Sequence, residues 1–279
     1  MSQDRWTITV SAEGLRSHLA QPLHQTLQHI TLGLRAVPLC PDGPLELDEV
    51  FFSFHFKTPA ASTPEAREEF KVWLVGVGLR EGMEALNAHI DEVRFFLGLM
   101  KRARGDGLRA PRAGVVDAVL RDLRMEELRK FARLGFVEKA SRLRSEFGIS
   151  VPHFDEVLTI QKARNCLTHR RGIVGPDDLK AGSDALQVRF VVHEIIHEDL
   201  AGRSHVTERN TSVLAGESLS VCREPQEKTF GLGQRVTFTA QEFQHLIYTL
   251  WAAGALLTDE LTNYAEVNSV LRRKPRESP

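Results

Sequence analysis

The feature that most constrains the fold is a long helical pattern that runs from Thr63 to about Arg104. Its start, Thr63-Pro64-Glu65, combines a threonine cap, a proline at the first helical position and an early acidic residue. Apolar residues then recur every three or four positions, which predicts one buried face. Those residues are Phe70, Trp73, Val77, Met83, Leu86, Ile90, Val93 and Leu97. The pattern predicts one wall of a helical bundle, bent at three glycines near its first third.

Further helices are predicted on both sides of this one. Apolar periodicity indicates helices at Ser11–Val37, Val115–Leu123 and Met125–Phe147, and a fourth that ends near Gly172. A capping box at Thr239-Ala240-Gln241-Glu242 opens the last helix. With so many helices and short connections, the fold class is mainly α.

A small antiparallel β element is expected in the C-terminal third. The strand candidates there are Leu186–Val192, Ser218–Cys222 and Arg235–Thr239, with the loop 202–216 between the first two. A short strand is also expected at Thr7–Val10, and the four phenylalanines of Val50–Phe56 fit either a strand or a buried turn that fills the bundle.

The segments predict one compact domain in four parts. Residues 1–62 form an N-terminal helix with an aromatic-rich connection, and residues 63–180 form the helical core. Residues 181–239 form the inserted β element, and residues 240–271 form a C-terminal helix that packs back on the core. The charged tail after it, Arg272–Pro279, is expected to fray.

Composition gives no global sign of nucleic-acid binding, but charge is unevenly distributed. The 279 residues carry a net charge of −1 and 26% charged residues. Between Lys101 and Glu146, however, thirteen Lys or Arg residues stand against seven acidic ones, a difference of +6. This basic run is either a solvated helix face or a local surface for a polyanion.

Several classes of protein are not indicated. The three cysteines, Cys40, Cys166 and Cys222, form no CxxC pair, so neither a disulfide framework nor a cysteine-rich metal site is expected. The N-terminus lacks the basic and apolar regions of a secretory signal, and no apolar run is long enough to span a membrane. We expect a soluble, cytoplasmic protein.

Polar chemistry is concentrated at the end of the helix that stops near Gly172. Asn165 and His169 are four residues apart, so the Asn165 amide can hydrogen-bond the His169 ring and orient it. Arg164 can swing its guanidinium toward the same place. An oriented imidazole beside a permanent cation suits a phosphate diester, because one moves protons and the other stabilises phosphoryl charge.

These residues resemble the motif of the HEPN family. The pattern Arg-Asn-x-x-x-His at Arg164–His169, followed by Arg-Arg-Gly-Ile-Val, carries the resemblance, and Leu134–Ala140 resembles the preceding helix of these proteins. The similarity covers residues 64–180. It implies a HEPN-like helical bundle, and many members of the family are metal-independent endoribonucleases.

The resemblance implies a function and partners. His169 would act as general acid and base on the ribose 2′-hydroxyl, Arg164 would stabilise the phosphorane, and Asn165 would orient the ring, with no metal or cofactor. We expect the neighbouring cations Lys162, Arg170 and Arg171 to bind the RNA. The family also implies a homodimer with two facing motifs, a role as a toxin or in phage defence, and an antitoxin or defence-system partner.

Two alternatives remain open. The same residues can bind phosphate without cleaving it, which would make the chain a non-catalytic RNA-binding or scaffolding protein. The stretch from His193 to His197 also matches the zincin pattern HExxH of a zinc metallopeptidase. That motif must lie on a helix. It continues a strand pattern here, on which His193 and His197 would be roughly 13 Å apart, too far to bind one zinc ion.

Overall fold

The computed structural model describes residues 11–44, 61–105, 121, 124–125, 128–179, 182–198, 204–206 and 218–268. Several expected features lie outside these residues. They are the strand at 7–10, the aromatic run 50–56, nearly all of the helix at 115–123 and the tail from 272.

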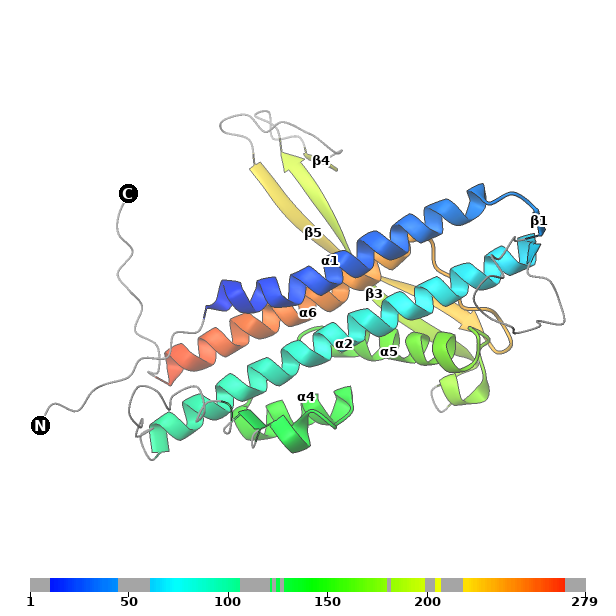
Figure 1. Ribbon diagram of the computed structural model, residues 1–279. Helices are drawn as coiled ribbons and strands as arrows, with labels where there is room; N and C mark the ends of the chain where they lie inside the picture. The colour runs from blue at the N-terminus through cyan, green and yellow to red at the C-terminus, as the bar shows by residue number, and fades with distance from the viewer. Residues whose placement is uncertain are drawn as a thin grey trace, which may run out of the picture. The chain divides into compact units, whose positions relative to one another are not determined.

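The chain is mainly helical, as the sequence predicts (Figure 1). The helices are α1 (Ala12–Ala36), α2 (Pro64–Gly105), α4 (Phe136–Phe147), α5 (Phe154–His169) and α6 (Ala240–Val267). Short 3-10 helices occupy Val37–Leu39 and Pro176–Asp178. Within the described ranges, no helix combines the length and apolar character needed to cross a membrane.

Local side-chain caps explain where two of these helices start. Thr63 Oγ1 accepts a hydrogen bond from the Ala66 N–H at 3.1 Å, which fixes the start of α2. At α6 the predicted capping box is confirmed, because Thr239 Oγ1 accepts from Glu242 N–H (3.1 Å) and Glu242 Oε2 accepts from Thr239 N–H (2.7 Å).

The prediction of one continuous helix over Met125–Phe147 is wrong. Residues 128–131 are helical, but a turn follows and α4 begins only after Gly135. Gly135 has an extended backbone and its N–H donates to Glu138 Oε2 at 3.4 Å. A cap of this kind interrupts the helix although the apolar spacing continues through it.

The β element is a three-stranded antiparallel sheet with the order β4-β3-β5. β3 (Ala185–Glu198) pairs with β5 (Ser218–Gly231) over its whole length, and β4 (Ser204–Val206) pairs with the end of β3. Thus β5 extends well beyond the predicted Ser218–Cys222, and β4 lies in the predicted loop. β1 (Gly43–Pro44) and β2 (Ala61–Ser62) form a separate pair.

The strand predicted at Arg235–Thr239 is not formed. This segment leads directly into α6, and only Arg235 makes an isolated bridge, to Ile173. Instead, β3 is hydrogen-bonded to two threonines on helices α5 and α6. The N–H of Arg189 donates to Thr159 Oγ1 of α5, and the N–H of Val191 donates to Thr249 Oγ1 of α6.

Contacts divide the chain into two compact units, which cut across the four predicted parts. Unit 1 comprises residues 1–23, 82–154 and 250–279, and unit 2 comprises residues 24–81 and 155–249. In unit 1, Gly254 of α6 allows a close approach, since a Cβ there would lie 2.3 Å from Leu19 Cδ2 of α1. His89 of α2 is buried beside it.

In unit 2 the glycines of α2 serve packing, and α2 continues as one helix through them. A Cβ at Gly76 would lie 3.2 Å from Leu167 Cβ of α5, and a Cβ at Gly78 would lie 2.5 Å from the Phe243 ring of α6. The predicted buried face of α2 is also corrected at its start. Phe70 and Trp73 stack on each other at 5.6 Å but are 47% and 58% exposed.

Candidate functional site

Helix α5 separates an apolar face from a polar one. Its buried residues pack into unit 2, and they are Val157, Ile160, Ala163, Cys166 and Leu167. Lys162, Asn165 and His169 follow one another at spacings of three and four residues, so they share another side of the helix. His169 is exposed to solvent, and Asn165 and Lys162 are partly exposed.

The end of α5 is shaped by two residues with left-handed backbone. Arg171 has φ of +52° and Gly172 has φ of +77°. The Gly172 N–H donates to the Cys166 carbonyl at 3.2 Å. Glycine suits position 172 for two reasons. Its φ is positive, and a Cβ there would lie 2.8 Å from Val72 of α2. The predicted glycine stop of this helix is therefore confirmed.

Beyond the helix end, Arg170 is held by two carboxylates. Its Nη1 lies 2.5 Å from Asp178 Oδ1, and its Nη2 lies 3.1 Å from Asp177 Oδ2. Asp178 has a side chain only 2% exposed, and its other oxygen accepts from the Gly175 N–H at 2.9 Å. The guanidinium predicted to bind RNA is thus neutralised within the protein.

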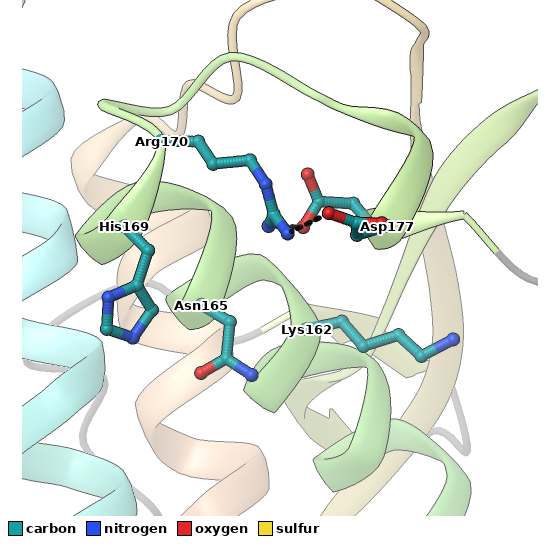
Figure 2. Close-up of a pocket in the computed structure, with 6 residues that line it drawn as sticks. Lys162, Asn165, His169, Arg170 and Asp177 are labelled. Carbon is teal, nitrogen blue, oxygen red and sulfur yellow. Dashed lines mark hydrogen bonds and ion pairs between the residues drawn. The ribbon is translucent and has the colours of Figure 1, made fainter.

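These groups line one pocket, which we call the α5 pocket, with a volume of about 290 Å³. Its lining residues are Lys162, Asn165, His169, Arg170, Asp177 and Asp178. Figure 2 shows the three α5 residues in succession and Arg170 reaching across to Asp177. The pocket therefore brings together four of the six predicted site residues.

Arg164 and Arg171 do not line this pocket. Arg164 Nη1 donates to Asn165 Oδ1 at 3.0 Å, so the amide holds the arginine. In the described part of the chain no hydrogen bond joins Asn165 to His169, and the orientation of the ring by the amide stays a prediction. Arg164 Nε is buried, without a hydrogen-bond partner in the described structure.

No protein-family model, curated protein or solved structure matches this chain.

The two carboxylates of the pocket were missed by sequence reasoning. Asp177 and Asp178 stand in the turn-forming stretch Gly175–Asp178, which reads only as a loop. One signal in the sequence could have identified Asp178. It stands three positions after Gly175, and an acidic residue at this spacing is typical of a helix cap. The structure has that cap, with Asp178 receiving the Gly175 N–H.

Cys166 lies in the interior behind the site and is not suited to act as a nucleophile. It is fully buried, and burial, followed by the nearby Asp178 carboxylate, raises the pKa of its thiol to about 12. A thiol with such a pKa stays protonated near neutral pH, whereas thiolates are the reactive form. Imidazole chemistry at His169 is the reactive function that the site offers.

The basic run is partly engaged inside unit 1. Lys139 is 2% exposed and its Nζ lies 2.6 Å from Asp91 Oδ1, while Arg124 pairs with Glu92. Burial raises the pKa of Asp91, and Lys139 acts in the opposite direction. Exposed cations remain at Arg129, Lys130, Arg133, Arg142 and Arg144.

The zincin motif lies on a strand, as the sequence pattern predicts. His193 and His197 are both within β3, opposite Arg223 and Leu219 of β5. Two residues four apart on a strand are separated by roughly 13 Å, which is too far for one zinc ion. Among the described residues, no group of three or more His, Cys, Asp or Glu could hold a metal.

Proposed function

We propose that the chain is a metal-independent endoribonuclease of the HEPN type that uses His169 and Arg164. The observation that carries this proposal is that His169 is exposed and lines the α5 pocket. A general acid or base must be reachable by the group whose proton it moves. His169 meets this requirement, and a pocket beside it can hold part of a substrate.

The reaction proposed is transfer of the phosphoryl group to the neighbouring ribose oxygen. His169 takes the proton from the 2′-hydroxyl as that oxygen bonds to phosphorus. The bond from phosphorus to the 5′-oxygen breaks, and this oxygen takes up a proton. The products are a 2′,3′-cyclic phosphate and a 5′-hydroxyl end. Arg164, which does not line the pocket and bonds Asn165 in this structure, would turn its guanidinium toward the phosphoryl oxygens to stabilise their charge.

The same proposal includes a homodimer. One imidazole that has accepted the 2′-hydroxyl proton is no longer a base, and the leaving oxygen needs a separate donor. A second His169 from a two-fold related copy would supply it. Under this proposal the protein acts on RNA in the cytoplasm, as a toxin or in phage defence, with an antitoxin or defence-system partner.

The test is cleavage of an unstructured RNA by purified protein in EDTA. Wild type is expected to produce cyclic phosphate ends, and His169→Ala is expected to lower the rate by about 10²–10⁴-fold, the usual contribution of acid–base catalysis. His24→Ala is the matched control, because His24 is another exposed histidine of unit 2. Equal rates for wild type and His169→Ala would contradict the proposal.

A second candidate is favoured by the contact between Arg164 and Asn165. Asn165 Oδ1 accepts a hydrogen bond from the Arg164 guanidinium. Among the described contacts, the His169 ring therefore lacks the amide partner expected from the sequence. A non-catalytic protein that binds RNA or acts as a scaffold needs no oriented ring. In that case wild type and His169→Ala would both retard RNA in a gel, and neither would release cyclic phosphate ends.

A further inference from the structure

The charge of the α5 pocket is balanced, which bears on what it can bind. Lys162 and Arg170 supply two positive charges, and Asp177 and Asp178 supply two negative ones. With a neutral imidazole the sum is zero. A phosphate favours sites with excess positive charge and backbone or side-chain donors. The pocket therefore suits an uncharged polar group of the RNA better than its phosphate.

The pocket offers a carboxylate acceptor that a ligand can reach. The Asp177 side chain lines the pocket and is 84% exposed, and Arg170 Nη2 contacts its Oδ2, so among the described contacts Oδ1 is the oxygen left for a ligand. Asp178, in contrast, is buried and engaged by Arg170 and the Gly175 N–H. Asp177 is thus the group of the pair that can recognise a donor on a ligand.

The α5 side of the pocket offers donors. The Oδ1 atom of Asn165 is occupied by Arg164, so this residue presents its amide Nδ2–H groups. Lys162, one helical turn earlier, presents an ammonium with three donors. A ligand that fits must therefore show adjacent donors to Asp177 and acceptors to Asn165 and Lys162.

We propose that the α5 pocket binds a guanine base of unpaired RNA and that Asp177 determines this specificity, an inference that rests on the proposed function. Guanine has two neighbouring donors, N1–H and N2–H₂. One can bond Asp177 Oδ1, and the other can share Oδ2 with Arg170, because a carboxylate oxygen accepts more than one hydrogen bond. Guanine also has the acceptors O6 and N7 for Asn165 and Lys162. Adenine and cytosine present an acceptor where guanine has N1–H, and uracil has a single donor between two carbonyls.

The size of the pocket agrees with one base. Its volume of about 290 Å³ is just below that of drug-sized ligand pockets, which span roughly 300–1,000 Å³. Bases of single-stranded RNA are commonly read on their Watson–Crick edges in this way. Because His169 lines the same pocket, we expect the 2′-hydroxyl of the bound guanosine to lie beside the imidazole, so that the cut falls directly after guanosine.

The first experiment measures equilibrium binding of the four nucleoside 3′-monophosphates by calorimetry. Wild type is expected to bind the guanosine nucleotide about tenfold more tightly than the others, a difference of about 1.4 kcal/mol. Asp177→Asn should remove this preference, while Asp184→Asn, at another exposed aspartate of unit 2, should keep it. Equal binding of all four by wild type, or a preference that survives in Asp177→Asn, overturns the inference.

The second experiment maps the ends produced from an unstructured RNA that contains every dinucleotide step. Cuts after guanosine are expected to predominate with wild type, and the ratio of these cuts to all others should fall in Asp177→Asn. Thermal unfolding checks that this exposed substitution leaves the fold intact. Cleavage without base preference overturns the inference and leaves the proposed nuclease standing. A guanosine preference in binding, with no cleavage, supports the inference and overturns the nuclease.

Discussion

His89 and His169 lie on helices with opposite surroundings. His89 of unit 1 is 4% exposed, and its Nε2 lies 2.9 Å from the Gly254 carbonyl and 3.0 Å from Thr258 Oγ1. His169 of unit 2 is exposed, at the end of α5 beside a pocket. One imidazole is hydrogen-bonded through Nε2 inside the protein, and the other faces solvent where a substrate can reach it.

The comparison teaches how to separate a packing histidine from a reactive one. Burial lowers the pKa of His89 to about 4, so its ring is neutral at every ordinary pH and holds helices α2 and α6 together in unit 1. A ring in such a place cannot exchange protons with a ligand. We therefore expect changes at His89 to affect folding and changes at His169 to affect chemistry.

The largest predicted effect is a loss of stability in acid that depends on His89. The unfolded ring binds a proton below about pH 6.5, whereas the folded ring does so only below about pH 4. Between these values the unfolded state binds more protons, so the free energy of unfolding falls as pH falls, by about 3 kcal/mol in total. Denaturant titrations from pH 7 to pH 4 measure it.

The control for this prediction is His89→Gln, measured over the same range. The variant is less stable at neutral pH but should lack this component of the pH dependence. The free energies of unfolding of the two proteins must be subtracted at each pH, because the raised pKa of Asp91 makes the protein more stable as pH falls, which opposes the effect of His89. Identical slopes for both proteins would show that His89 does not titrate as its burial requires.

A somewhat smaller loss is expected at the buried carboxylate beside His169. Asp178→Ala leaves Arg170 without its 2.5 Å partner and the Gly175 N–H without an acceptor. Breaking a buried pair costs about 3–5 kcal/mol, and we expect about 2 kcal/mol because Arg170 is 32% exposed. Urea unfolding tests this. Asp177→Asn, which changes the 84% exposed partner of Arg170, should cost under about 1 kcal/mol.

The close approach of helices at Gly254 predicts the next effect. In Gly254→Ala the new methyl group would lie 2.3 Å from Leu19 Cδ2 and 3.2 Å from the His89 ring. Leu19 can shift its side-chain end, so we expect destabilisation of about 1–2 kcal/mol, within the range of overpacked cores. A fall in the midpoint of thermal unfolding measures it. Gly135→Ser, where a Cβ meets nothing within 4 Å, serves as the control.

The starts of α2 and α6 and the end of α5 could be predicted from the sequence because their signals are local. Thr63, the Thr239 capping box and Gly172 each act on residues within a few positions, and apolar spacing located the helices between them. The exposed Phe70 and Trp73 could not be identified in this way. Their spacing fits a buried face, and only the positions of neighbouring helices decide which part of it is covered.

The candidate site was predictable to the same limited degree. The α5 residues were found because a helix fixes which of its side chains share a side. Asp177 and Asp178 were not found, because their approach to Arg170 depends on the turn after the helix. The Asn165 amide had two partners within reach, and helix geometry alone could not show that it would take Arg164 rather than His169.

The smallest predicted effect on stability is at His169 itself, and it makes the contrast with His89 sharpest. His169→Gln changes an exposed ring at a helix end, so the free energy of unfolding should stay within about 0.5 kcal/mol of wild type at pH 7. Urea unfolding measures this, alongside cleavage of RNA by the same preparations. A variant that remained folded and lost cleavage would separate chemistry from stability at this position. A loss of stability as large as that at His89 would instead mean that the ring is a packing residue, and the function proposed for it would fall.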